Sequence, residues 1–257
     1  MKLTFLGTGT SQGIPMIACN CEVCLSTDFR DKRTRSSIYL ETDEKKILVD
    51  TTPDLRFQLL REKINQVDAV VYTHGHADHI LGLDDLRRFC EMENRAMPLY
   101  GSKEALETLS RVFFYAFNGE NRFKGYVHPE AVVVEKAFEL GSLTFHPLEV
   151  PHGKTRTWGY RIDEKGIPKV AYFCDCKTLP EPVQKQIQNI PILILDGLRF
   201  KSHPTHLSLP EAIELSHQIK AQNTYFTHLA HAIRHQEVEP TLSKNQFLAY
   251  DGLKLEI

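Results

Sequence analysis

The stretch VVYTHGHADHILGLDDLRRF, residues 70–89, decides how the rest of the chain is interpreted. Four β-favouring residues run directly into three histidines and an aspartate that occupy six positions. Alternate side chains of a strand lie on the same side, so His74 and His76 can point the same way at the strand end. Gly75 gives the chain room to turn, and Asp78 and His79 can then face back from the next segment. Imidazole and carboxylate ligands of this kind suit Zn²⁺, Mn²⁺ or Fe²⁺, and a helical H-E-x-x-H site is excluded by the spacing and by the missing glutamate.

The composition is that of an ordinary soluble protein. The 257 residues allow one large domain or two small ones, with 42% hydrophobic and 25% charged residues. A formal charge of −2 offers no general attraction for a nucleic-acid backbone. No apolar run approaches the ~18 residues of a membrane span, and the first residues do not resemble a signal peptide. We therefore expect a cytoplasmic protein, in which six cysteines serve metal binding or catalysis more readily than disulfides.

The hydrophobic pattern predicts one domain, residues 1–257, of the α/β class. Expected strands cover residues 2–7, 36–42, 46–50, 69–73, 132–135, 143–150, 157–162, 169–174, 191–195, 223–227, 247–250 and 253–257. Expected helices cover residues 54–63, 83–91, 103–115, 180–189 and 209–220, the last with Ser208 as its cap and Glu211 three residues on. Because strands come in runs in each half, two sheets packed face to face with helices outside are favoured over a single parallel sheet.

The segment from about 84 to 130 has a less regular pattern. Its aromatic residues are Phe113, Phe114, Tyr115, Phe117, Phe123 and Tyr126. We interpret it as a helical cap, inserted in the domain, that packs its aromatic side chains into the core. A substrate-pocket wall or a dimer contact is the alternative.

The histidine-rich stretch resembles the H-x-H-x-D-H motif of the metallo-β-lactamase superfamily, and FLGTGTSQG at residues 5–13 resembles its first strand and glycine-rich turn. The resemblance implies a four-layer αβ/βα sandwich with a two-metal site at the edge between the sheets. It also implies three further ligands, which LEVPHGK, VAYFCDC and TYFTHLAH offer as His152, Asp175 and His228. By resemblance, one metal is held by His74, His76 and His152, the other by Asp78, His79 and His228, and Asp175 bridges them.

Two divalent ions about 3.5–4 Å apart share a water and lower its pKa towards neutrality. The expected nucleophile is this bridging hydroxide, which Asp78 can orient while it also serves as a ligand. The ligand types leave Zn or Mn, and also Fe, open as the catalytic metals.

A second cluster, ACNCEVC, places Cys19, Cys21 and Cys24 within six residues. Three cysteines so close together in a polar loop indicate a structural zinc site, and His231 is the candidate for the fourth ligand of a Cys₃His tetrahedron. Such a site would join the N-terminal loop to the segment that supplies His228. Cys174 and Cys176, which flank Asp175, are interpreted as small buried residues.

The Cys-x-Cys-x-x-Cys loop, THLAH and the closing FLAYDGLKLEI narrow the resemblance to the phosphoribosyl 1,2-cyclic phosphate phosphodiesterases, a branch near tRNase Z. That branch implies a homodimer and a further histidine on the phosphate side, which PTHLSLPEA offers as His206 just before a helix. His206 would protonate the leaving oxygen or stabilise the transition state, whereas a surface role is favoured for His203.

The expected function is the metal-dependent hydrolysis of a small phosphodiester, expected to be cyclic, to a phosphomonoester. No membrane and no nucleic-acid partner is expected. Other hydrolases of the same fold remain open, namely a tRNase Z-like nuclease, a thioesterase or a lactonase. A non-catalytic zinc-binding or ligand-binding protein is the alternative from another class.

Overall fold

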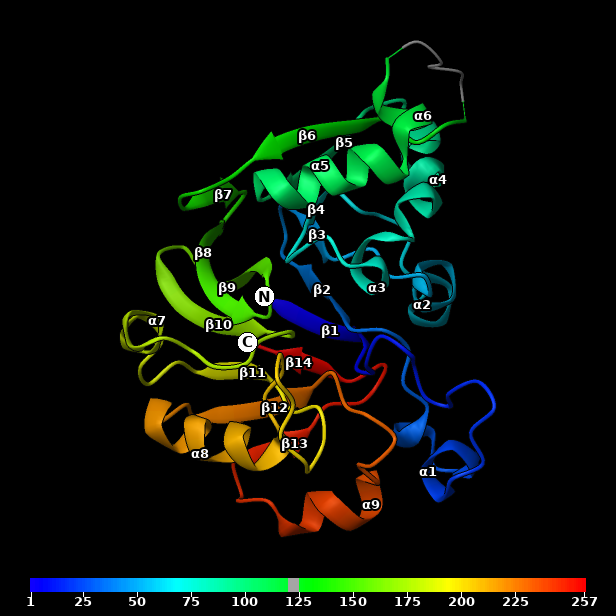
Figure 1. Cartoon of the computed structure of the whole chain (residues 1–257). Helices are drawn as coiled ribbons and strands as arrows, with labels where there is room; N and C mark the ends of the chain where they lie inside the picture. The colour runs from blue at the N-terminus through cyan, green and yellow to red at the C-terminus, as the bar shows by residue number, and fades with distance from the viewer. Residues whose placement is uncertain (120–124) are drawn as a thin grey trace.

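Two seven-stranded sheets face each other, and helices cover the outer side of each (Figure 1). The computed structural model describes residues 1–119 and 125–257, so the expected cap residue Phe123 lies outside the described residues. The four-layer α/β architecture expected from the sequence is confirmed. The two ends of the chain lie side by side, and the Met1 amino group donates to the Ile257 carbonyl at 3.2 Å.

The first sheet has the strand order β14-β1-β2-β3-β4-β5-β6. Its strands are β14 (Lys254–Glu256), β1 (Lys2–Gly7), β2 (Ser37–Glu41), β3 (Lys46–Val49), β4 (Ala69–Val71), β5 (Met97–Gly101) and β6 (Pro129–Val133). The pairs from β14 to β3 are antiparallel, and those from β3 to β6 are parallel.

The second sheet repeats this plan in the order β13-β12-β11-β10-β9-β8-β7. Its strands are β13 (Gln246–Leu248), β12 (Asn223–Thr227), β11 (Ile192–Asp196), β10 (Ile167–Phe173), β9 (Thr155–Glu164), β8 (Leu143–His152) and β7 (Phe138–Leu140). The pairs from β7 to β10 are antiparallel, and those from β10 to β13 are parallel.

Five longer helices form the outer layers. The first sheet carries α2 (Leu55–Glu62), α4 (Arg87–Glu93) and α5 (Lys103–Val112), and the second carries α7 (Glu181–Gln186) and α8 (Leu209–Ile219). The remaining helical segments are single turns: α1 (Glu22–Leu25), α3 (Ala77–Ile80), α6 (Phe114–Phe117), α9 (His235–Val238), η1 (Phe29–Asp31), η2 (Leu83–Leu86) and η3 (Glu239–Thr241).

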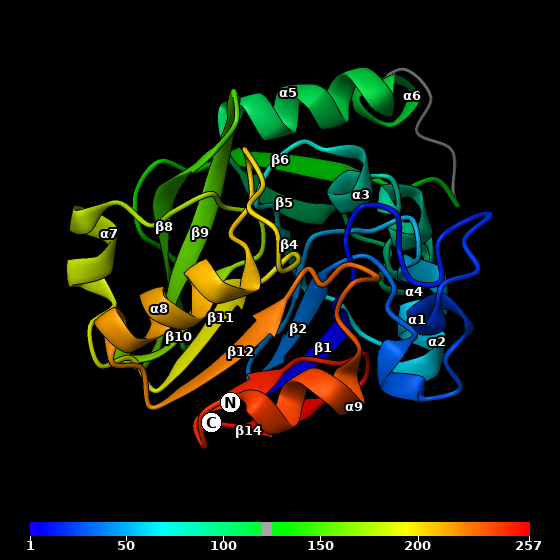
Figure 2. The same cartoon turned by 60° about the horizontal axis from the view of Figure 1, so that its bottom comes forward.

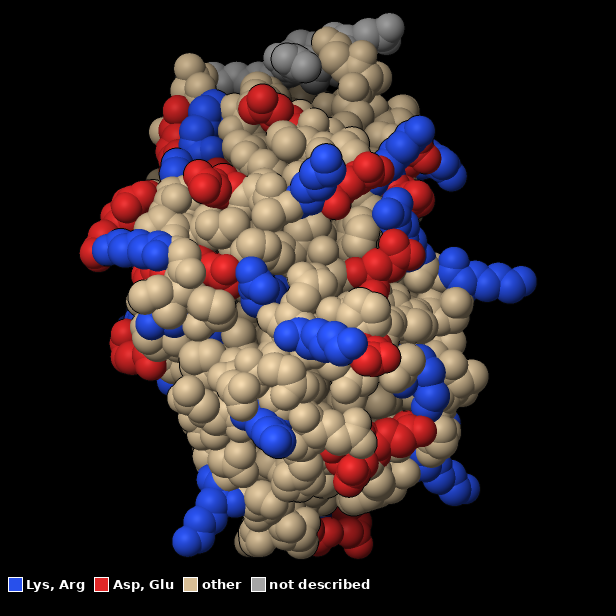
Figure 3. All heavy atoms as spheres, turned by 90° about the vertical axis from the view of Figure 1, so that its left-hand side faces the viewer, with Lys and Arg blue, Asp and Glu red and all other residues tan. Residues whose placement is uncertain are grey.

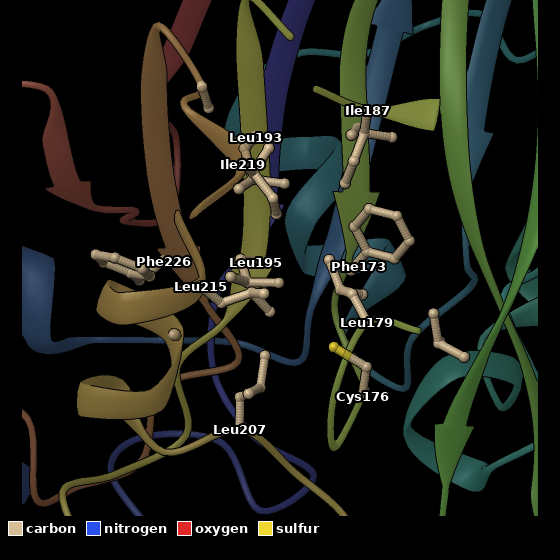
Figure 4. Packing of buried hydrophobic residues seen from close by; sticks show 14 of the residues in the cluster. Phe173, Cys176, Leu179, Ile187, Leu193, Leu195, Leu207, Leu215, Ile219 and Phe226 are labelled. Carbon is tan, nitrogen blue, oxygen red and sulfur yellow. The ribbon is translucent and has the colours of Figure 1, made fainter. Parts of the chain in front are cut away.

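Strand alternation divides the core into layers. Ile192 and Ile194 of β11 face the space between the sheets, whereas Leu193 and Leu195 face the outer helices. Figure 4 shows Leu193 and Leu195 beside Leu215 and Ile219, with Phe173 close by. Each strand of this kind is therefore buried on both sides, which explains its continuous apolar sequence.

The segment 84–130 differs in part from its prediction. It contains α4, α5 and α6, but it also supplies β5, which the sequence pattern did not indicate. Phe113 is buried, and Tyr115 and Phe117 pack against the first-sheet core, whereas Phe114 is 67% exposed. The described residues contain no helix long and apolar enough to cross a membrane. On the face shown in Figure 3, acidic and basic side chains are interspersed, as the small net charge would lead one to expect.

The predicted start of α8 is confirmed: Ser208 and Glu211 form a capping box, and the Glu211 carboxylate also accepts from Lys177 Nζ at 2.9 Å. Burial opposes ionisation of Glu211, but the bonds from Lys177 and Ser208 outweigh it and lower its pKa to about 2. An acid with a lowered folded-state pKa adds stability above its ordinary pKa of 4.5 and loses it as the pH falls towards 2.

We expect Glu211→Gln, which keeps the cap, to lower the Tm at pH 6 by about 2–4 °C. The effect is small because the Glu211 side chain is 39% exposed and screened. The difference from the unchanged protein should shrink between pH 5 and pH 2 in thermal melts. Glu214→Gln, on an exposed position of the same helix, is the control. A Tm difference that is constant over this pH range would contradict the assignment.

Candidate metal centre

The expected ligands of the catalytic metals meet where strands of both sheets end. His74 follows β4, His152 is the last residue of β8, and His228 directly follows β12. Asp175 lies two residues beyond β10, and Asp78 and His79 belong to α3, the single turn after β4. Carboxyl ends of parallel strands share one edge of a sheet, so the topology gathers residues that are far apart in sequence.

Asp175 lies between two groups of ligand atoms. Its Oδ1 is 3.3 Å from His79 Nε2 and 3.5 Å from His228 Nε2. Its Oδ2 is 3.7 Å from His152 Nε2 and 3.9 Å from His74 Nε2. One carboxylate thus presents a separate oxygen to each group, which is the arrangement a bridging ligand requires.

The first group consists of His74, His76 and His152, whose ring nitrogens lie within 4.8 Å of one another. His76 directs Nδ1 to within 3.3 Å of His152 Nε2, while its Nε2 contacts Thr155 Oγ1 at 2.9 Å. His152 Nδ1 contacts the Thr205 carbonyl at 3.0 Å, which fixes Nε2 as the atom that faces Asp175.

The second group consists of Asp78, His79, Asp175 and His228. Asp78 Oδ2 is 3.3 Å from His79 Nε2 and 3.9 Å from His228 Nε2. Burial alone would lower the pKa of His79, but Asp175, Asp78 and Asp50 raise it well above its ordinary value. Burial likewise opposes protonation of His228, yet Asp175 and its acidic neighbours raise its pKa to about 9.

Divalent cations fit both groups. His74 Nε2, His228 Nε2 and Asp175 Oδ1 are buried and have no hydrogen-bond partner among the described residues. Such atoms are costly to bury unless they have a partner, and nitrogen and carboxylate oxygen are ligands of Zn²⁺, Mn²⁺ and Fe²⁺. The buried carboxylates raise the pKa values of His79 and His228, so positive charge is favoured at this position. Bound cations would supply the same positive charge.

Asp50, which the sequence interpretation missed, supports both groups from behind. Its Oδ2 accepts from His79 Nδ1 and from Thr73 Oγ1, each at 2.8 Å, and its Oδ1 accepts from the Thr73 amide. Thr73 Oγ1 in turn contacts His74 Nδ1 at 3.0 Å. Asp50 has a left-handed backbone with φ of 65°, a conformation that costs a residue other than glycine about 1–3 kcal/mol. The available signal was KILVD, an apolar run that ends in an aspartate.

We expect Asp50→Asn to weaken metal binding or turnover about 10–100-fold, because partners of metal-ligating histidines have effects of this size. The amide can still accept a hydrogen bond but supplies no negative charge to His79. Metal affinity is measured by chelator competition, with Asp54→Asn as a control outside the centre. Unchanged affinity and turnover in Asp50→Asn would show that His79 needs no carboxylate behind it.

His206 lies beside these groups and is held by Asp196, the last residue of β11. His206 Nδ1 is 2.7 Å from Asp196 Oδ2, and a ring nitrogen of His206 lies within 4.8 Å of ligand atoms of His152 and Asp175. Burial raises the pKa of Asp196, and burial with the neighbouring His228 lowers the pKa of His206 to about 4. The pair is therefore favoured in its neutral form. Asp196 was missed, although ILILD repeats the signal of Asp50.

The four residues of the expected structural zinc site also come together. His231 Nδ1 is 3.3 Å from Cys19 Sγ, 3.4 Å from Cys21 Sγ and 4.0 Å from Cys24 Sγ. In a tetrahedral zinc site the usual bond lengths place sulfur and nitrogen about 3.6 Å apart, so a zinc ion fits among them. In Figure 2 the N-terminal loop with α1 lies near α9, and Arg234 contacts Glu22 at 3.6 Å.

Arg33, which is 1% exposed, links the N-terminal loop to the segment that contains His231. It donates to the carbonyls of Ala230 and Ile233, on either side of His231, and pairs with Asp31 at 3.0 Å. Leu229 N also donates to the Thr8 carbonyl at 2.8 Å. The loop that holds His228 and His231 is therefore anchored to the N-terminal segment by the protein chain itself.

Three interpretations change in detail. Gly75 does not have a left-handed backbone conformation, so the turn does not need glycine. A Cβ at this position would lie 3.0 Å from Thr108 Cβ, so the close approach of α5 favours glycine. His203 is half-buried, with its ring centroid 5.1 Å from that of His206, instead of lying free on the surface. Cys174 is buried as expected, but it also lies within 4.8 Å of ligand atoms of Asp50 and His79.

Two adjoining cavities open at the centre. One, of about 320 Å³, is lined by Ser11, His76, Asp78, His152, Gly153, Lys154, Thr155, Asp175, Thr205, His206 and His228. The other has about 370 Å³ and shares Ser11, His206 and His228 with the first. A small molecule can therefore reach the metal ligands from solvent.

Known proteins of similar sequence share this framework. The model of the Beta-lactamase superfamily domain matches residues 45–229. Octanoyltransferase of Porphyromonas gingivalis is 36% identical over 259 residues, 99% of this chain but 51% of that protein, so the chain spans about half the length of this curated relative. Coenzyme PQQ synthesis protein B of Methylobacterium radiotolerans is 28% identical over 77% of this chain and 73% of its own length.

Solved structures extend the comparison to the whole chain. A crystal structure described as a new diphosphatase from the PhnP family is 42% identical, with a TM-score of 0.91, and covers 100% of this chain and 97% of its own. Zn²⁺-bound PqqB from Methylobacterium extorquens is 21% identical, with a TM-score of 0.83 and full coverage of both chains, which establishes a shared fold.

Proposed function

Because the chain belongs to the family of Beta-lactamase superfamily domains and is a hydrolase of the metallo-β-lactamase fold, we propose that it cleaves a phosphorus–oxygen bond of a small substrate whose phosphate carries two substituents. Such substrates are phosphodiesters, among them cyclic ones, and diphosphates. The observation that carries the proposal is Asp175, whose two oxygens face two ligand groups while His206 lies alongside.

The ligand groups would hold two divalent ions, Zn or Mn and also Fe remaining open, and the cysteine cluster one structural zinc. When bound, paired divalent ions lower the pKa of water and neutralise charge on phosphoryl oxygens. Asp78 can act as a ligand and orient a water through its second oxygen. His206 can deliver a proton to the leaving oxygen from its other ring nitrogen while its Nδ1 takes up the proton that Asp196 holds in the neutral pair.

The comparisons favour phosphate chemistry over the other hydrolyses of this fold. The 42%-identical structure is described as a diphosphatase, a name that implies attack at phosphorus. A phosphodiester and a diphosphate present the same reacting group, a phosphoryl centre that holds one negative charge and one leaving oxygen. The name octanoyltransferase favours acyl chemistry as a second candidate, although it belongs to a protein about twice as long.

The first experiment combines metal analysis with turnover of bis(p-nitrophenyl) phosphate, with and without added Mn²⁺. About three metals per chain and turnover are expected, followed by a panel of cyclic phosphodiesters and diphosphate diesters. One tightly bound zinc without turnover under any metal would favour a non-catalytic binding protein. A filled two-metal centre that cleaves an octanoyl thioester but no phosphate would replace the proposal with acyl hydrolysis.

We expect His206→Asn to lower kcat about 10²–10⁴-fold, the usual contribution of a proton donor. The loss should be largest for poor leaving groups, which need the proton, and smallest for p-nitrophenolate, which leaves unprotonated. Metal content should stay at the level of the unchanged protein, which separates this role from metal binding. An equal loss for good and poor leaving groups would contradict proton donation by His206.

A further inference from the structure

The second of the two cavities contains a positive charge that pairs with no carboxylate in the part of the chain that the structure describes. We call it the Arg199 cavity; its walls include Ser11, Gln12, Arg199, His203 and His206. Among the described residues, the Arg199 guanidinium donates only to the backbone carbonyls of Lys201 and Ser202, at 3.2 and 3.3 Å. Within residues 1–119 and 125–257, no carboxylate forms an ion pair with it. Since a guanidinium has five N–H donors, Arg199 retains donors for a ligand.

Lys177 and Arg156 near the centre are already paired, whereas Lys154, which lines the first cavity, forms no ion pair among the described residues. Lys177 binds Glu211 at 2.9 Å, and Arg156 binds Glu149 at 3.1 Å and Glu104 at 3.4 Å. No aspartate or glutamate lines the Arg199 cavity. An anion placed there would therefore meet one unpaired guanidinium and neutral donors, without repulsion from an acidic wall.

The position of Arg199 is fixed by its backbone. The Arg199 carbonyl accepts from Leu209 N at 2.9 Å. The neighbouring Leu198 donates its N–H to the Leu207 carbonyl, and its own carbonyl accepts from Ala230 N. This segment therefore lies against the base of α8 and against the loop of His228. The guanidinium itself is oriented by its bonds to the Lys201 and Ser202 carbonyls, so it loses less conformational freedom when it binds a carboxylate or phosphate.

The place of His206 decides which part of a substrate enters this cavity. His206 and His228 line both cavities, so they stand at the boundary between the metal ligands and Arg199. If His206 protonates the leaving oxygen, the leaving group extends from this boundary into the Arg199 cavity. We propose that Arg199 binds an anionic substituent of the leaving group, so that preferred substrates carry a second negatively charged group, such as a phosphate, beyond the bond that breaks. This inference rests on the proposed function.

The test compares two substrates that differ only in the charge of the leaving group: methyl 4-nitrophenyl phosphate and methyl 3-carboxy-4-nitrophenyl phosphate. We expect the metal-loaded protein to prefer the carboxylated substrate about tenfold in kcat/KM, as one charged hydrogen bond allows. Arg199→Met should reduce this preference to about twofold or less. Lys201→Met, which removes a charge two residues away outside the cavity, should keep it. The ratio is the readout because a disordered loop would slow both substrates alike.

Two results would overturn the inference. The preference for the carboxylated substrate could persist in Arg199→Met, or it could be lost in Lys154→Met but not in Arg199→Met. In both cases hydrolysis itself would continue and the proposed function would stand. If neither these two substrates nor any phosphodiester or diphosphate of the panel is hydrolysed, the proposed function fails. Calorimetric binding of 5-hydroxy-2-nitrobenzoate, the carboxylated leaving group, then decides the inference. Binding about tenfold tighter than that of 4-nitrophenol, and lost in Arg199→Met, would support the subsite. Equal binding of the two phenols would refute it.

Discussion

Asp175→Ala is expected to lower the turnover of phosphodiesters by at least about a thousandfold, equivalent to ~4 kcal/mol, while the fold is retained. The reason is geometric: among the residues that the structure describes, Asp175 is the side chain whose two oxygens face both ligand groups. Without it, neither group keeps its full set of ligands, and the charge that would balance two cations falls by one. Metal content measured on the purified variant should therefore drop together with activity.

The control for Asp175→Ala is Asp43→Ala, on an exposed position between β2 and β3. It removes the same charge without touching the centre and should leave metal content and turnover unchanged. Circular dichroism and a thermal melt establish that both variants are folded. Normal turnover by Asp175→Ala with two metals still bound would rule out the bridging role.

The local part of the centre could be predicted from the sequence, and its distant part only through resemblance. His74, His76 and His79 identify themselves because they follow one apolar strand within six positions. His152 and Asp175 each stand alone in sequence, and nothing but the family pattern singled them out. The topology explains why they belong together, since strands of both sheets end at one edge.

The supporting carboxylates were missed for a physical reason. Asp50 and Asp196 each follow or end a buried apolar strand. Aspartates that merely cap a turn occupy the same position in sequence, so the pattern alone does not identify a supporting residue. What distinguishes them is their partners, His79 at 2.8 Å and His206 at 2.7 Å, which only the folded chain brings near. Arg199 is likewise distinguished from other basic residues near the motifs only in the folded chain, where it has no carboxylate partner among the described residues.

Short elements escaped prediction because they carry too little pattern. β7 has three residues and α1, α3, α6 and α9 have four each, less than the length over which a period of 2 or 3.6 can be recognised. β5 contains Pro98, which weakens a strand prediction, and its place in the sheet depends on pairing with β4 and β6. These pairings are long-range contacts that local sequence does not encode.

Cys21→Ser is expected to lower stability far more than it alters the chemistry of the site. A structural zinc contributes about 10–16 kcal/mol to the folding of small zinc domains, and loss of one thiolate should cost at least about 3 kcal/mol of that here. For a chain of this size the Tm would fall by about 6–12 °C. Cys21 Sγ is 3.4 Å from His231 Nδ1 and also accepts from Cys24 N as the cap of α1. Serine can keep the capping bond, so the expected loss comes from the missing thiolate at the zinc site.

The matched control is Cys90→Ser, which replaces a buried thiol on α4 that packs in the core of the first sheet. Its zinc content should equal that of the unchanged protein, whereas Cys21→Ser should hold one zinc fewer per chain. Because Arg33 still fastens the carbonyls of Ala230 and Ile233, His228 should remain in place below the melting temperature, and the turnover per remaining catalytic metal pair should change less than about threefold. If Cys21→Ser keeps its full zinc content and an unchanged Tm, the structural zinc site is refuted. If it loses most of its turnover while its stability is unchanged, the cysteine cluster acts on the reaction itself.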